Sequence, residues 1–345
     1  MWSYRCWVFV SCALALGSAV PWHDCSTGAD GLTDPTRPGP FAVTVEHAER
    51  IAGVPSFPMY RPANLTAMAK WPVYVFMHGS GSDDRFLALS LERWASHGFI
   101  VVAPYMGTEP DCTNMLNDGK CSDKSPDGRF IQDAIAWLRQ QNADPASELY
   151  ARVDLDQLAV GGWSMGGVST IKAVAALPAG TVRAVVLDSA SVVACGFFYN
   201  YSQAVVQADY AEARRRTSGA TAAPWFIYSA TNDFLHTSNL KLHNTAGANS
   251  TGVYAQYKTK YCKDRPPFLN TTIWGLEWAT GDIDGFKGHF CAGTYAMTGW
   301  ATTYLKLMLQ QRGSASSTCH AMIWGSGPES LMNDDRMDVV HLRSA

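Results

Sequence analysis

A serine between glycines is the residue of this sequence best suited to nucleophilic chemistry. Ser164 stands in Gly162-Trp163-Ser164-Met165-Gly166, a G-x-S-x-G match. An apolar stretch typical of a buried strand precedes it at 158–161, and a helix is expected over 165–177. A tight strand-to-helix turn of this kind lifts the serine oxygen clear of a sheet and leaves no room for side chains at the glycines. The flanking elements strengthen a pentapeptide that alone would be weak evidence.

A serine nucleophile needs a base, and the base needs an acid that orients it. In folds with this turn the order along the chain is serine, acid, histidine. Asp233 directly follows the strand expected at 225–229 and is the preferred acid. Asp188, at the end of the preceding expected strand, is the alternative acid.

His289 is the preferred base, because it follows the last expected strand, at 271–278, and precedes the terminal helix. A loop in that position can reach across the sheet to Ser164. His236 is only three residues from Asp233 and is too close to bridge it to the serine. The remaining candidates have no strand end nearby: His243, His320 and His341.

Two backbone N–H groups are expected to stabilise the negative charge that develops on a substrate oxygen. The first belongs to Met165, the residue after the nucleophile. The second is assigned to Ser80 in His78-Gly79-Ser80-Gly81, the loop after the strand at 73–77. The His78 side chain is expected to support this loop, and with Trp163 it is a candidate for the wall of a substrate cleft.

Strands and helices alternate along the chain, which predicts an α/β fold with a mostly parallel sheet. Runs that are apolar on both faces, as at 73–77 and 99–103, suit central strands covered by helices on both sides. No internal repeat or domain linker interrupts the pattern. Residues 191–222 and 236–268 are longer than connecting loops need to be, and are interpreted as rim insertions or surface decoration.

Residues 1–19 are predicted to form a secretory signal peptide. Arg5 gives a positive start, 6–16 is an uncharged apolar run, and Gly17-Ser18-Ala19 supplies small residues for cleavage. The run is too short to span a bilayer, and no later stretch is long and apolar enough to do so. We therefore expect a secreted, extracellular protein with one catalytic domain over 20–345, whose core covers 39–310 and is followed by an extension over 312–345.

Secretion accounts for the cysteines, because disulfide bonds form in oxidising compartments. Removal of Cys6 and Cys12 with the signal peptide leaves an odd number, seven. Cys112 with Cys121 is the first candidate disulfide bond and Cys291 with Cys319 a weaker one. Zinc is the rival interpretation, but the sequence has no C-x-x-C pair, so no metal site and no cofactor are predicted.

Sequons and charge agree with this compartment. The chain has N-glycosylation sequons at Asn64, Asn200, Asn249 and Asn270. The formal net charge is −3, with 27 Lys and Arg against 30 Asp and Glu, and no basic run stands out. This balance gives no electrostatic basis for binding nucleic acid. A monomer without a transmembrane segment is expected.

With these residues in place, the chain resembles the α/β-hydrolases of the dienelactone-hydrolase-like branch. It is most similar there to secreted cutinases and PET (polyester) hydrolases. The matching stretches are Gly39–Val43, Trp94–Val102 and Gly162–Gly167. The resemblance implies a mostly parallel, twisted eight-stranded sheet flanked by helices. It also implies a catalytic set of Ser164, Asp233 and His289, with Met165 and Ser80 as oxyanion donors.

The resemblance further implies a serine carboxylesterase that acts on small-molecule, lipid or polymeric esters through an acyl-enzyme. A lipase, an enzyme like platelet-activating-factor acetylhydrolase and an acyltransferase with the same triad are alternatives. The sequence departs from the family at two places near the site. Ser80 occupies a position that is often aromatic, and Ser189-Ala190-Ser191 lies where a cleft tryptophan is common.

Overall fold

The computed structural model describes residues 38–48, 55–79, 84–105, 128–190, 203–218, 223–231, 233, 252–258, 295–310, 318–327 and 329–343. These residues form a nine-stranded sheet in the order β1-β2-β4-β3-β5-β6-β7-β8-β9. The strands are β1 (Val43–Glu46), β2 (Met59–Pro62), β3 (Trp71–Met77), β4 (Ile100–Val102), β5 (Val153–Trp163), β6 (Ala184–Asp188), β7 (Trp225–Ala230), β8 (Gly252–Tyr257) and β9 (Met337–Arg343). Strands β4, β3 and β5 to β8 run parallel, whereas β1, β2 and β9 pair antiparallel at the two ends.

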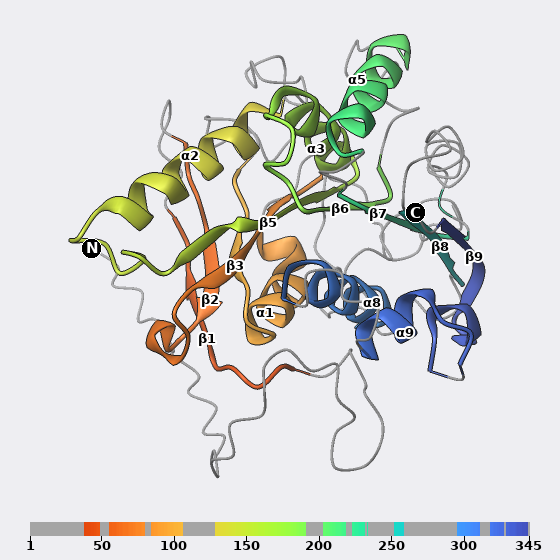
Figure 1. The fold of residues 1–345 in the computed structure, drawn as a ribbon, viewed down its shortest axis with the longest axis horizontal. Coiled ribbons are helices and arrows are strands. Elements are labelled where there is room, and N and C mark those ends of the chain that lie inside the picture. The colour runs from red at the N-terminus through yellow and green to blue at the C-terminus, as the bar shows by residue number, and fades with distance from the viewer. Residues whose placement is uncertain are drawn as a thin grey trace, which may run out of the picture.

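Helices cover both faces of this sheet (Figure 1). The described α-helices are α1 (Ala88–Ser96), α2 (Arg129–Ala143), α3 (Met165–Ala176), α5 (Gln203–Arg216), α8 (Tyr295–Leu305) and α9 (Thr318–Trp324). One apolar cluster joins α2, α3 and α5 to one face, and the other joins α1, α8 and α9 to the opposite face. Because both faces are covered, β3, β4, β6 and β7 are buried along their whole length, as their apolar runs predict.

The expected α/β-hydrolase fold is therefore confirmed, but the expected number of eight strands is wrong. The ninth strand, β9, pairs with β8 from Gly252↔Arg343 to Tyr257↔Met337. It lies within residues 312–345, the expected extension beyond the core. The apolar residues of α9, such as Cys319 and Ile323, are fully buried in the same cluster as α8.

Two segments interpreted as rim insertions contain regular elements of the fold. Within 191–222, α5 is the helix that precedes β7, and α3 and α5 pack on the same face of the sheet. Within 236–268, β8 is a fully buried strand that pairs in parallel with β7. The strand expected at 271–278 lies outside the described residues.

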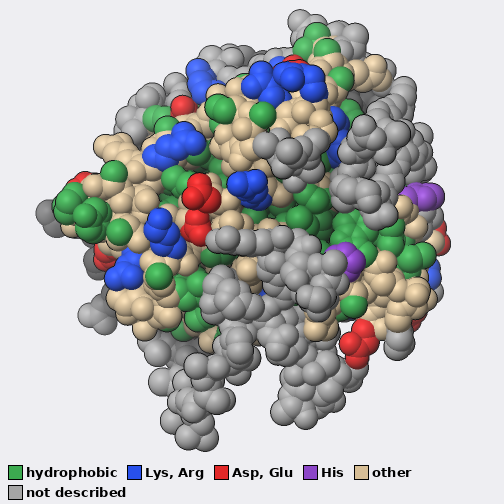
Figure 2. Space-filling view, viewed as in Figure 1, with side chains coloured by type: hydrophobic (Ala, Val, Ile, Leu, Met, Phe, Trp, Pro, Cys, Tyr) green, Lys and Arg blue, Asp and Glu red, His purple; other side chains and the backbone are tan. Residues whose placement is uncertain are grey.

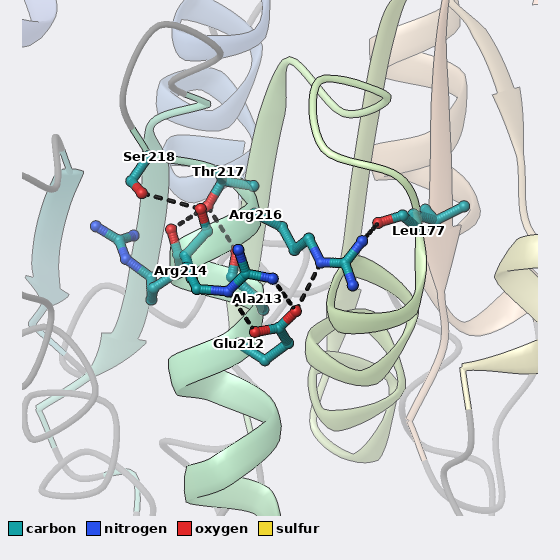
Figure 3. Close-up of polar contacts among 8 residues, drawn as sticks. Leu177, Glu212, Ala213, Arg214, Arg216, Thr217 and Ser218 are labelled. Atoms are coloured by element: carbon teal, nitrogen blue, oxygen red, sulfur yellow. Dashed lines mark hydrogen bonds and ion pairs between the residues drawn. The ribbon is translucent and has the colours of Figure 1, made fainter.

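The end of α5 is tied to the end of α3 by an arginine (Figure 3). Glu212 accepts hydrogen bonds from both Arg215 and Arg216. Arg216 also donates to the carbonyl oxygen of Leu177, 3.3 Å away. In the same last turn of α5, the Arg214 guanidinium lies 4.9 Å from the centre of the Trp225 ring. The arginines at this end of α5 therefore contact the end of α3 and the Trp225 ring of β7.

Basic and acidic side chains are scattered among one another over the described part of the face in Figure 2. That face therefore presents no extended field of one sign. Among the described residues, no helix combines the length and the apolar character needed to cross a membrane.

Candidate active site

Ser164 lies alone between the last residue of β5 and the first residue of α3. Its backbone angles are φ 56° and ψ −121°, a conformation that residues with a side chain rarely adopt. Strain of this kind persists only where the surrounding structure enforces it, and it concentrates at functional sites. The residue is 7% exposed. The start of α3 directs its partial positive charge toward the serine.

The glycines around Ser164 are required by the close approach of backbone atoms. A Cβ at Gly162 would lie 2.3 Å from the carbonyl oxygen of Gly166. A Cβ at Gly166 would lie 2.1 Å from the carbonyl oxygen of Met77, the last residue of β3. The sequence therefore folds here into the turn that the G-x-S-x-G spacing predicts.

The loop after β3 passes directly beside the serine. A Cβ on Gly79 would lie 3.0 Å from the Cβ of Ser164 and 2.6 Å from the Trp163 ring. His78 is buried, and its Nδ1 donates to the Gly79 carbonyl oxygen at 2.8 Å, which suits a supporting role. Ser80 lies outside the described residues, so the geometry covers only the first half of the candidate oxyanion loop.

Two acids lie at the same edge of the sheet as Ser164, because β5, β6 and β7 are parallel and end together. Asp233 is fully buried just after β7, and its N–H donates to the Ala230 carbonyl oxygen at 3.1 Å. Asp188 ends β6, and its carbonyl oxygen accepts a 2.9 Å hydrogen bond from the Ser164 N–H. His289 lies outside the described residues, so the base of the expected triad stays a prediction.

The Asp188 carboxyl group has a polar environment that the sequence does not reveal. It accepts hydrogen bonds from the hydroxyls of Ser189 and Tyr228. Burial, and then the negative charge of Asp233, raise the pKa of Asp188 well above its usual range. Ser189 itself has a positive φ of 47°. Tyr228 sits in an apolar strand and looks like a core residue, so only its partner in space shows its polar role.

Of the remaining candidate residues, two are described by the structure and five are not. Trp163 is 2% exposed and packs in the apolar core under Gly79. Asn64 is exposed, and its side chain accepts from the Thr66 N–H at 3.0 Å. Five candidates lie outside the described residues: Cys112, Cys121, Asn200, Asn249 and Asn270. The described residues contain no group of three or more His, Cys, Asp or Glu side chains arranged to hold a metal ion.

Comparison with known proteins agrees with the geometry. Residues 30–191 match the model of a family described as PET hydrolase-like. The cutinase Est1 of Thermobifida alba is 32% identical over 138 residues, which cover 39% of this chain and 41% of that protein. The cutinase Cut1 of Thermobifida fusca is 30% identical over 165 residues, covering 47% of this chain and 46% of that protein. The aligned regions thus cover less than half the length of these relatives. The family match over residues 30–191 includes Ser164.

Proposed function

Because this chain has the α/β-hydrolase fold and is similar to cutinases and PET hydrolase-like proteins, we propose that it is a serine hydrolase of carboxylic esters. The single observation that carries the proposal is Ser164 in a strained turn, enclosed by glycines that admit no side chain. Asp233 at the same sheet edge supports the proposal, since a buried acid after β7 suits the order serine, acid, histidine.

In the proposed reaction, His289 takes the proton of the Ser164 hydroxyl as its oxygen attacks the ester carbonyl carbon. Asp233 orients the imidazole and stabilises its charged form. The N–H groups of Met165 and Ser80 stabilise the oxyanion. His289 then returns the proton to the departing alcohol, leaving an acyl group on Ser164. Water, deprotonated by His289, releases the acid and restores the serine. This sequence of steps uses no metal or organic cofactor.

We propose a polyester or a similar ester as the substrate, on the basis of the named relatives. A panel of p-nitrophenyl esters from acetate to palmitate, together with cutin and PET suspensions, tests this choice. Preference for short chains and release of monomers from polymer support a cutinase-like enzyme. Preference for long-chain emulsions points to a lipase, and new esters formed with added alcohols point to an acyltransferase.

We further propose that the protein is secreted after loss of residues 1–19. The seven cysteines that remain after loss of residues 1–19, of which Cys319 is fully buried in α9, support passage through an oxidising compartment. The exposed position of Asn64 supports glycosylation there. Expression of the full chain in a eukaryotic secretory host, followed by N-terminal sequencing of the medium fraction, tests this. An uncleaved, cell-retained product would contradict it.

The nucleophile assignment is tested with Ser164→Ala. This change should lower kcat for p-nitrophenyl butyrate on the order of 10⁶-fold, because a triad does not work without its nucleophile. Far-UV circular dichroism and the melting temperature should stay near those of the parent protein. A fluorophosphonate probe should label the parent and not the variant. Activity of the variant within tenfold of the parent would refute the proposed function.

A further inference from the structure

The acid at the end of β6 takes part in contacts that the proposed function leaves unused. Asp188 pairs in register with Trp163, the residue before the candidate nucleophile. On its other side it pairs with Tyr228 of β7, five residues before Asp233. Asp188 therefore lies between the strand that carries the nucleophile and the strand that leads to the acid.

The backbone around Asp188 joins these two strands at their ends. The Ser164 N–H donates to the Asp188 carbonyl oxygen at 2.9 Å, and the Ser189 N–H donates to the Tyr228 carbonyl oxygen at 2.8 Å. Both donors belong to residues with positive φ angles, 56° for Ser164 and 47° for Ser189. Ser164 and Ser189 thus both adjoin Asp188 at the end of β6, one through a hydrogen bond and the other along the chain. Strained residues need restraint from the surrounding structure, and these hydrogen bonds supply part of it.

The next residue continues the contact toward the nucleophile helix. A Cβ on Gly167, in the first turn of α3, would lie 2.6 Å from the Cβ of Ala190. The turn at 188–190 is therefore pressed against the start of α3, directly behind Ser164. A shift of this turn would move the helix start and the serine with it.

The carboxyl group of Asp188 fixes the turn from inside the protein. It is 2% exposed and accepts hydrogen bonds from the Ser189 and Tyr228 hydroxyls. Among the described residues, the titratable groups around it are Asp233, Tyr228 and Tyr74 of β3, and Tyr304 of α8 lies next to Tyr74. Burial and then the charge of Asp233 raise its pKa, and the hydrogen bonds from Ser189 and Tyr228 act in the opposite direction.

We propose that Asp188 is a positioning residue of the ester-hydrolase site, which holds the Ser164 turn and the end of β7 in a fixed relation. The inference rests on the proposed function of Ser164. The Asp188 carboxyl acts through its hydrogen bonds to Ser189 and Tyr228, whereas Asp233 is the acid that orients the base. These two acids at neighbouring strand ends have separate tasks.

Three variants test this division with p-nitrophenyl butyrate. Asp188→Ala should lower kcat by about 10- to 100-fold, with KM changed less than about threefold, because misplacement of a nucleophile slows the chemical step. Asp188→Asn keeps the shape of the group and an oxygen that accepts these hydrogen bonds, so its kcat should stay within about threefold of that of the parent. Asp233→Asn should lower kcat by about 10³- to 10⁴-fold. Asp338→Asn, an exposed change of the same type, serves as the control.

A second readout tests the raised pKa of Asp188 without relying on catalysis. When the pKa of a carboxyl group is higher in the folded than in the unfolded protein, the folded state loses stability as pH rises above about 4, the ordinary pKa of Asp. As pH rises from 5 to 8, the melting temperature of Asp188→Asn should therefore increase relative to that of the parent. Asp338→Asn should show no such gain.

Each outcome separates this inference from the proposed function. Loss of kcat in Asp188→Asn as large as in Asp233→Asn would make Asp188 the charged acid and overturn the inference. A folded Asp188→Ala enzyme with kcat within twofold of the parent would also overturn it. If Asp188→Ala does not fold, Tyr228→Phe decides, with a severalfold fall in kcat expected and an unchanged kcat contradicting. Activity that survives Ser164→Ala would instead remove the proposed function, and the melting series would still test the raised pKa of Asp188.

Discussion

At the scale of single residues, the site depends on how closely three pieces of backbone approach one another. Ser164 can hold a φ of 56° because β5, α3 and the loop after β3 surround it without intervening side chains. The closest of these approaches is at Gly166, where a Cβ would meet two carbonyl oxygens, those of Met77 and His78. Backbone atoms cannot move aside as the end of a flexible side chain can.

We expect Gly166→Ala to displace the start of α3 and to destabilise the protein by about 1–3 kcal/mol or more, as overpacking does. The melting temperature and kcat for p-nitrophenyl butyrate measure the two effects, and both values should fall. Gly327→Ala is the matched control, because a Cβ there has no neighbour within 4 Å. It should change stability by less than about 0.5 kcal/mol. Equal melting temperatures for the two variants would argue against the close approach.

At the scale of elements, the C-terminal strand is joined to both β8 and α8. Trp300 of α8 donates from Nε1 to Asp334 Oδ2 at 2.6 Å, and Arg336 forms an ion pair with the same carboxylate at 2.8 Å. Lys258, directly after β8, donates from Nζ to the Asp335 carbonyl oxygen at 2.6 Å. The turn before β9 therefore connects two elements that are far apart in the sequence.

Burial acts against ionisation of Asp334, but the hydrogen bonds and charge of Arg336, with the Trp300 hydrogen bond, outweigh it and lower the pKa of Asp334. A lowered pKa stabilises the fold above the ordinary Asp value of about 4, and this contribution is lost as pH falls below it. Asp334→Asn should thus cost about 1–3 kcal/mol at pH 7, typical of hydrogen bonds to a charged group. The deficit should shrink toward pH 3.

Denaturant unfolding of the parent and of Asp334→Asn at pH 7 and pH 3 measures this change. The exposed neighbour Asp335 provides the control, since Asp335→Asn keeps the backbone carbonyl that Lys258 uses. A deficit of the same size at both pH values would mean that the contact is not electrostatic.

At the scale of the whole molecule, the sheet is complete only with its last strand. β8 is buried along its length, and β9 covers its outer edge through a register that runs from Gly252 to Tyr257. A chain that ends at residue 312 would lose β9 and the buried residues of α9, and it would expose the edge of β8. An exposed apolar edge strand pairs with other chains and aggregates.

We expect this truncated chain to lose cooperative unfolding and to aggregate, as observed by near-UV circular dichroism and light scattering. Removal of residues 344–345 alone, beyond the end of β9, should leave the melting temperature unchanged. A soluble truncated chain with the cooperativity of the full protein would show that the core ends near residue 310 after all.

The turn at Ser164 and the general plan of the sheet follow from the amino-acid sequence alone. Glycines two residues to either side of Ser164 leave room for the close approach of backbone atoms in this turn, and that requirement can be read directly from the residue types. Strands such as β3 and β7 are apolar on both faces, so their burial also follows from composition. The positions of α1, α2 and α3 follow from apolar spacing to within a few residues.

The tertiary structure alone decided which polar groups meet at the edge of this sheet. Tyr228 becomes a partner of Asp188 only because β6 and β7 pair in one particular register. The pairing of β8 with β9 joins residues about 85 positions apart, and no local pattern encodes such a partner. Local sequence restricts backbone angles, whereas hydrogen bonding and electrostatics between distant residues depend on the whole packed fold.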